Sequence, residues 1–149
     1  MSENDFTVFG SRCLVCGYGR LGKILASTLK RMGADVTVAA RKCSDFAWIK
    51  TAHMKALHVR HLAEYVCEFD TVYNTVPAKL FTGQVLERVG RGTLIIDLAS
   101  KPGGLDFEKA RALEVKYRWA LSLPGKTAPK SAAGIIYDTI INIIEEESL

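Results

Sequence analysis

The chain has 149 residues, a formal net charge of +4 and 48% hydrophobic residues, which fits one domain with a single core. No apolar run approaches the ~20 residues of a membrane span, and the N-terminal sequence lacks the basic-then-apolar order of a signal peptide. Basic residues are mixed with acidic ones rather than gathered as in nucleic-acid-binding proteins. We therefore expect a cytoplasmic domain that binds neither a membrane nor nucleic acid.

The first predicted strand, at 12–16, runs into a glycine-rich turn with the spacing G-x-G-x-x-G. Apolar residues at 21–32 recur at helical spacing, so the turn joins a strand to a helix. In such a turn the first glycine allows the bend, the second lets the backbone approach a pyrophosphate, and the third lets the helix pack closely. Free N–H groups at the helix start attract phosphate, so we predict a dinucleotide site rather than a purely structural turn. The predicted cofactor contacts in the turn are Gly17, Tyr18, Gly19, Arg20, Leu21 and Gly22.

The rest of the chain alternates between strand and helix, as a parallel sheet with crossover helices requires. The expected fold class is α/β, a doubly wound parallel sheet of the Rossmann type with about six strands in the order 3-2-1-4-5-6 and three αβα layers. In this fold the ligand crevice lies beyond the carboxyl ends of the strands. After a helix stop at Gly33, strands are predicted at 35–40, 55–59, 70–77, 92–100 and 115–121, and helices at 45–54, 61–67, 82–90, 106–114 and 127–147.

The end of the second strand indicates which dinucleotide binds. An NAD site usually has Asp or Glu about 20 residues after the glycines, but here Ala40 is followed by Arg41 and Lys42. A carboxylate would repel the 2′-phosphate of NADP, whereas a guanidinium binds it through charge-assisted hydrogen bonds. We expect NADP rather than NAD, and the alternative is a solvated basic pair. At later strand ends the predicted cofactor contacts are Asn74, Thr75, Val76, Pro77, Ala99 and Ser100.

The cysteines and histidines do not predict a metal site. Cys13 and Cys16 have C-x-x-C spacing, but residues three apart on a strand point to opposite faces of the sheet. We interpret both as buried apolar residues. His53, His58 and His61 lack further ligands at a recognisable spacing.

Several segments of the chain resemble one enzyme family. The segments are GYGRLGKILASTLKRMGADVTVAAR, NTVPAKLF, LIIDLASKPGGLDF and LPGKTAPKSAAGII. They are similar to the NADP-binding, C-terminal domain in the family of the dipicolinate synthase A subunits, which is related to the 2-hydroxyacid dehydrogenases. The similarity runs over about residues 5–145, and SKPGG and LPGKTAPKSA are its most specific parts.

The resemblance implies a function and a domain organisation. The implied reaction is the oxidation of a dihydrodipicolinate-pathway intermediate to dipicolinate in a sporulating bacterium, and the implied partner is a flavoprotein-like second subunit. Family members carry an additional N-terminal domain. We therefore expect residues 1–149 to form a single dinucleotide-binding domain, excised from a longer chain with a substrate domain and inactive in isolation.

Hydride transfer requires the protein to orient cofactor and substrate and to manage charge. The implied substrate is a small dicarboxylate, so cations near the nicotinamide should carry the chemistry, and Lys101 and Lys126 are the predicted catalytic residues. No histidine or carboxylate is recognisable as a general base. The nicotinamide-binding domain of another 2-hydroxyacid-type dehydrogenase and a nonenzymatic nucleotide-sensing module remain alternatives, and homo-oligomerisation is left open.

Overall fold

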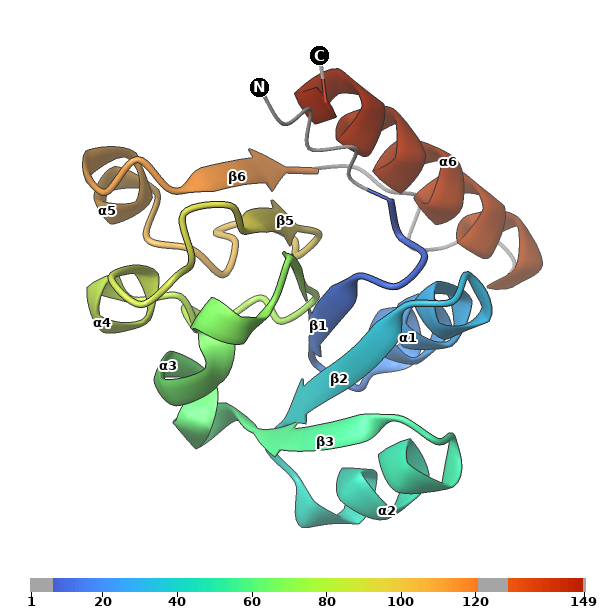
Figure 1. Ribbon diagram of the computed structural model, residues 1–149. Helices are drawn as coiled ribbons and strands as arrows, with labels where there is room; N and C mark the ends of the chain where they lie inside the picture. Colours follow the sequence, from blue (N-terminus) through green and yellow to red (C-terminus); the bar gives the residue numbers. More distant parts are fainter. Residues whose placement is uncertain (1–6, 121–128, 149) are drawn as a thin grey trace.

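The computed structural model describes residues 7–120 and 129–148 and confirms the predicted α/β class, with helices on both faces of one parallel sheet (Figure 1). The strand order is β3-β2-β1-β4-β5-β6, and each neighbouring pair is parallel. This is the predicted order, in which the chain starts at the centre of the sheet and winds outward in both directions. The strands are β1 (Arg12–Cys16), β2 (Asp35–Ala40), β3 (Lys55–His58), β4 (Thr71–Asn74), β5 (Leu94–Asp97) and β6 (Lys116–Trp119).

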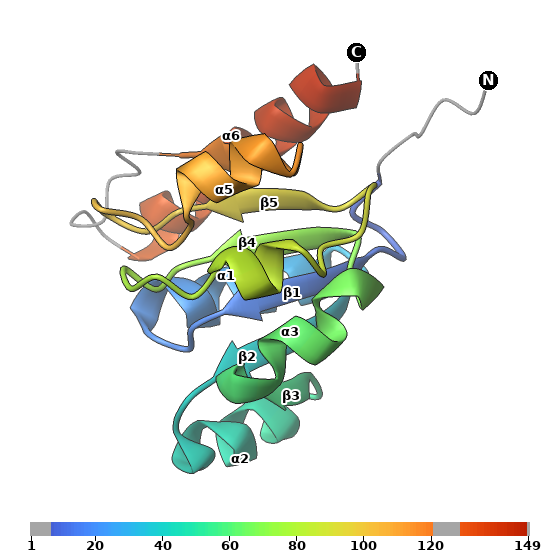
Figure 2. The ribbon, with the colours of Figure 1, turned by 90° about the vertical axis from the view of Figure 1, so that its left-hand side faces the viewer.

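The helices form two layers, which Figures 1 and 2 show on opposite sides of the sheet. Helices α1, α2 and α6 pack on one face, and α3, α4 and α5 pack on the other. The central strands are therefore buried on both faces and are nearly continuous apolar runs. The helices are α1 (Arg20–Arg31), α2 (Cys43–Thr51), α3 (Leu62–Tyr65), α4 (Gly83–Leu86), α5 (Phe107–Ala112) and α6 (Pro129–Ser148), with 3-10 turns at Val59–His61 and Val66–Glu68.

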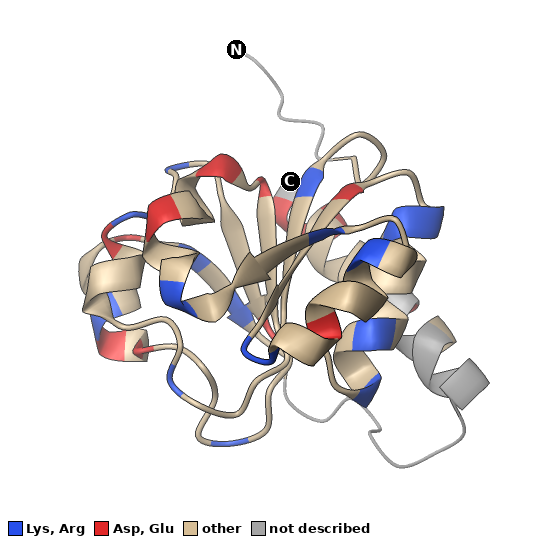
Figure 3. Ribbon diagram, turned by 90° about the horizontal axis from the view of Figure 1, so that it is seen from below, with Lys and Arg blue, Asp and Glu red and all other residues tan. Residues whose placement is uncertain are grey.

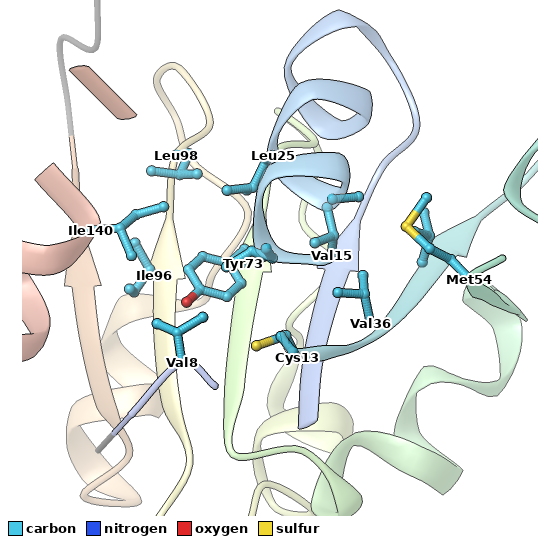
Figure 4. Packing of buried hydrophobic residues seen from close by; sticks show 14 of the residues in the cluster. Val8, Cys13, Val15, Leu25, Val36, Met54, Tyr73, Ile96, Leu98 and Ile140 are labelled. Carbon is cyan, nitrogen blue, oxygen red and sulfur yellow. The ribbon is translucent and has the colours of Figure 1, made fainter. Parts of the chain in front are cut away.

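The two cysteines of β1 lie in different layers of the core. Figure 4 shows Cys13 in the layer on the α1 side with Tyr73 and Ile96 of neighbouring strands. Cys16 packs in the layer on the α3 side. Both thiols are fully buried, and this burial raises the pKa of each. The prediction that the C-x-x-C residues are buried on opposite faces is confirmed.

Strands β4 and β5 end three residues before the predicted ends, and side-chain hydrogen bonds explain both of these ends. Strand β4 ends at Asn74, whose side-chain oxygen accepts a hydrogen bond of 3.1 Å from the Val76 N–H. Strand β5 ends at Asp97, whose carboxylate accepts a hydrogen bond of 3.1 Å from the Ala99 N–H. Such local bonds compete with the sheet ladder and turn the backbone away from it. In both cases the chain consequently leaves the sheet at the carboxyl ends of the strands.

The helix boundaries are partly as predicted. The helix predicted at 82–90 ends at Leu86, and tighter i→i−3 turns follow it. The helix predicted at 61–67 is the short α3 with a 3-10 turn on either side. The stop at Gly33, which has φ +87°, is confirmed, and the Asp106 side chain caps the start of α5. Among the described helices, none is long and apolar enough to cross a membrane.

Candidate functional site

The glycine turn lies at the carboxyl end of β1, in the middle of the sheet between β2 and β4. Gly17 has φ +100°, and a Cβ added there would lie 2.5 Å from Oγ1 of Thr75, whose hydroxyl donates to the Cys16 carbonyl at 2.8 Å. A Cβ on Gly22 would overlap the carbonyl group of Gly17. A Cβ on Gly19 would meet no atom within 4 Å. Packing therefore requires the first and third glycines, whereas the middle glycine borders open space.

A cavity of about 510 Å³ extends from this turn across the ends of β2, β3 and β4. The sequence predicted many of its walls, namely Gly17, Tyr18, Gly19, Arg20, Leu21, Gly22, Arg41, Lys42, Thr75, Val76 and Pro77. It did not predict Ala39, Ala40, Val59, Ala78 and Leu80, which complete the lining. Val59 directly follows β3, so applying the carboxyl-end rule to that strand as well would have found it.

The first turn of α1 offers hydrogen-bond donors to this cavity. The backbone N–H groups of Arg20, Leu21 and Gly22 precede the first intrahelical donor, which is the N–H that bonds the Gly19 carbonyl, so they have no partner within the helix. No side chain caps the helix at Gly19, and its first turn contains no acidic residue. The positive end of the helix dipole lies at the same place as these donors, so both would stabilise an anion bound at Gly19.

Two cations lie where β2 ends. Arg41 and Lys42 are exposed, line the cavity and lead into α2. Within the described part of the chain, neither forms an ion pair with a carboxylate. Figure 3 shows basic and acidic positions mixed around the fold, so these cations are a local feature rather than part of a basic face. Open space at the middle glycine, an uncapped helix start and two unpaired cations together fit a dinucleotide with several phosphates.

One buried carboxylate holds the ends of β4 and β5 together. Asp97 is 0% exposed and accepts hydrogen bonds from the Asn74 side-chain amide (2.9 Å) and from the N–H groups of Ala99 (3.1 Å) and Gly104 (2.7 Å). The Trp119 indole N–H donates to the Ala99 carbonyl at 3.2 Å. A Cβ on Gly104 would overlap the Asn74 side chain, so this glycine allows the close contact. The network fixes the loop of residues 98–104.

The other predicted site residues that the structure describes do not line the cavity. The side chain of Asn74 is buried in the network, and Ala99 is buried beside it. Ser100 and Lys101 are exposed on the loop 98–104. Lys126 lies outside the described residues. In the ranges that the structure describes, no group of three His, Cys, Asp or Glu side chains is arranged to hold a metal ion.

Sequence comparison relates the chain to known oxidoreductases. Residues 8–95 match the family described as acetohydroxy acid isomeroreductase, NADPH-binding domain. The chain is also 36% identical over 146 residues to the A subunit of dipicolinate synthase from Bacillus subtilis (strain 168). This alignment covers 98% of the chain and 49% of the relative, so the chain spans about half the length of the curated relative that it matches.

Structure comparison gives the same relationship. A crystal structure of the dipicolinate synthase A subunit from Bacillus halodurans matches with a TM-score of 0.79 and 37% identity, over 95% of this chain and 48% of that chain. Salmonella D-lactate dehydrogenase matches with a TM-score of 0.62 and 19% identity, over 72% of this chain and 32% of that chain. At the lower identity the likeness supports the fold alone.

Proposed function

Because the chain belongs to the acetohydroxy acid isomeroreductase NADPH-binding domain family and is related to the A subunit of dipicolinate synthase over nearly its whole length, we propose that it binds NADP in preference to NAD. The family makes it an NAD(P)-binding, oxidoreductase-like domain. The preference for NADP rests on one observation. Arg41 and Lys42 line the cavity after β2, where an NAD site has a carboxylate.

The described residues divide the binding of the cofactor between them. The α1 start and Gly19 would hold the pyrophosphate through backbone N–H groups, and Arg41 and Lys42 would hold the 2′-phosphate. Bound NADP supplies the hydride acceptor. The protein contributes orientation and electrostatic stabilisation rather than covalent chemistry.

We assign this chain to an oxidoreductase of the dipicolinate synthase type, acting in sporulation with a flavoprotein-like second subunit. Its proposed substrate is a dihydrodipicolinate-pathway intermediate. Aromatisation of the dihydropyridine ring to dipicolinate would remove one hydride, for which NADP⁺ would be the acceptor, and one proton, which would be released. The substrate carries two carboxylates, and the groups that we assign to them are Lys101 and Lys126, of which Lys101 lies on the exposed part of the loop 98–104.

Calorimetric titration of NADP⁺ and NAD⁺ at fixed ionic strength tests the cofactor preference. We expect NADP⁺ to bind more tightly, and Arg41→Ala to weaken NADP⁺ by roughly 10-fold or more with little effect on NAD⁺, because a hydrogen bond to a charged group contributes about 1.5–3 kcal/mol. Arg88→Ala is the matched control, since Arg88 is exposed and does not line the cavity. Equal affinities of the unmutated protein for the two nucleotides would refute the proposal.

A second assay tests the reaction. Because the chain spans about half of its curated relative, it is assayed alone and fused to the other half of the Bacillus subtilis protein. Each protein receives the flavoprotein-like second subunit, NADP⁺ and chemically generated dihydrodipicolinate, and NADPH and dipicolinate are measured together. We expect both products in equal amounts from the fusion. NADPH without dipicolinate would contradict the assigned substrate.

A further inference from the structure

We propose that Arg60 is a specificity-determining residue of the nucleotide cavity and contacts the 2′-phosphate together with the cations after β2. This inference rests on the proposed preference for NADP and adds a residue from the turn after a different strand. Its starting point is the register of the sheet, in which Ala40 of β2 pairs with His58 of β3. Both strands end at this pair, so the residues that follow them leave the sheet at the same level.

The turn after β3 is part of the cavity wall. Val59, its first residue, lines the cavity with Ala40 and Arg41. Arg60 is the next residue and is exposed. A long cationic side chain therefore starts one residue from the wall that faces the predicted phosphate site.

The position of this turn is fixed by the last residue of β3. Nδ1 of His58 accepts a hydrogen bond of 3.2 Å from the backbone N–H of Arg60 and so caps the turn. The His58 ring also packs edge-on against Phe46 of α2, with 6.0 Å between the ring centroids. Because α2 begins directly after Lys42, the same contacts fix the position of the turn that carries Arg60 relative to Arg41 and Lys42.

The guanidinium of Arg60 is oriented by a neutral partner. Its Nε–H donates to Nε2 of His61 at 3.0 Å, and Nδ1 of His61 lies 2.9 Å from a carboxylate oxygen of Glu64. When Nδ1–H of the His61 ring donates a hydrogen bond to Glu64, the ring is neutral and its Nε2 lone pair accepts the hydrogen bond from Arg60. The imidazole therefore stands between the Arg60 and Glu64 charges.

Within the described residues, the two terminal amino groups of Arg60 have no hydrogen-bond or ion-pair partner. At the amino end of the central strand β1, Arg12 by contrast uses both Nε and a terminal amino group for Asp70. A planar guanidinium held through Nε presents its two remaining amino groups as a fork. This geometry suits bidentate contact with a phosphate.

Four probes separate a contact with the 2′-phosphate from a structural role of the turn. They are NADP⁺, NAD⁺, 2′,5′-ADP and 5′-AMP, and within each pair of them the 2′-phosphate is the only difference. Calorimetry is run on Arg60→Ala, on Arg60→Lys and on the control Arg88→Ala, an exposed arginine outside the cavity. We expect Arg60→Ala to weaken NADP⁺ and 2′,5′-ADP about 10-fold and NAD⁺ and 5′-AMP less than about 2-fold. Arg60→Lys should lie between, because it keeps the charge and loses the fork.

The outcomes distinguish this inference from the function on which it rests. An equal loss for the phosphorylated and unphosphorylated probes would mean that Arg60 acts only through the turn, which overturns the inference. Unchanged affinities in Arg60→Ala, with a selective loss in Arg41→Ala, would also overturn it and leave the NADP preference intact. If the unmutated protein does not prefer NADP⁺, the proposed function fails and the inference fails with it.

Discussion

Alanine substitutions at Gly19 and Gly22 should separate nucleotide binding from folding. A methyl carbon at Gly22 would lie 2.8 Å from the carbonyl carbon of Gly17 and closer still to its oxygen, and real Cβ atoms essentially never come within 3.0 Å of such atoms. The start of α1 must therefore move away from the turn. A methyl carbon at Gly19 meets nothing within 4 Å, and the φ of −78° at this residue suits any L-amino acid.

For Gly22→Ala we expect a loss of stability. Overpacking costs about 1–3 kcal/mol, and the higher helix propensity of alanine offsets up to about 1 kcal/mol of it. The net loss in the free energy of unfolding is about 1–2 kcal/mol, which lowers Tm by roughly 2–8 °C for a domain of this size. Nucleotide affinity should fall as well, because the displaced helix start carries the phosphate donors.

For Gly19→Ala we expect the opposite pattern. The fold should be about as stable as the unmutated one, because alanine restricts the unfolded chain and this gain offsets its poorer preference for the N-cap position that Gly19 occupies. Affinity for NADP⁺ should fall by about 10-fold or more, since the methyl group fills the space in which the backbone approaches the pyrophosphate. One variant would thus lose binding without losing stability.

Urea denaturation and calorimetric titration on the same preparations measure both effects. Gly92→Ala is the matched control, because a Cβ at Gly92 also meets nothing within 4 Å and this glycine does not line the cavity. If Gly19→Ala binds NADP⁺ as tightly as the control, the phosphate does not lie at this glycine. If Gly22→Ala is as stable as Gly19→Ala, the packing argument is wrong.

Three further predictions follow from the described residues. Asp97→Asn should lower the free energy of unfolding by about 2–3 kcal/mol, because the NH₂ group of the new asparagine must face an N–H group from which the carboxylate accepts a hydrogen bond. Urea titration measures the loss, and a loss no larger than that of Asp35→Asn, at an exposed carboxylate, would refute the prediction. Burial raises the pKa of Cys16, so its thiol stays protonated in the fold while an unfolded thiol ionises near ~8.5. The free energy of unfolding therefore receives the full contribution of this thiol below that pH and loses up to ~1.4 kcal/mol per pH unit above it. Cys16→Ala should remove this part of the alkaline loss of stability, which denaturation at a series of pH values measures. Lys101→Ala should reduce dipicolinate formation by the fusion and leave the affinity for NADP⁺ unchanged, and a weakened affinity in calorimetry would contradict its assignment to substrate.

The glycine turn could be predicted from sequence because its determinants are local. Gly17, Gly19 and Gly22 lie within six residues, and the change from strand to helix periodicity brackets them. The strand ends were less predictable, because they depend on which atoms the last side chains bond. Asn74 and Asp97 are compatible with a strand by position, and their hydrogen bonds to turn N–H groups end the ladder.

The site residues that the sequence did not reveal depend on contacts between distant segments. Asp97 bonds Asn74, 23 residues earlier, and Gly104, seven residues later, so its role needs the neighbouring strand in place. Val59 and Arg60 follow a short edge strand with no glycine and no acidic residue to mark its end. Their relation to the cavity arises from the register of β2 and β3, which the sequence pattern does not specify.

The placement of the cations also separates affinity from specificity. The glycine turn and the α1 start offer backbone groups to a pyrophosphate that NAD and NADP share, and a side chain at Gly17 or Gly22 would reach into the packed interior. Arg41, Lys42 and Arg60 are exposed side chains on loops, so substituting them leaves the packed core untouched. On our proposal these three residues carry the discrimination between the two cofactors. It follows that cofactor preference in this fold can change through a few surface substitutions while sequence and fold still match the family, so the preference has to be argued from these side chains.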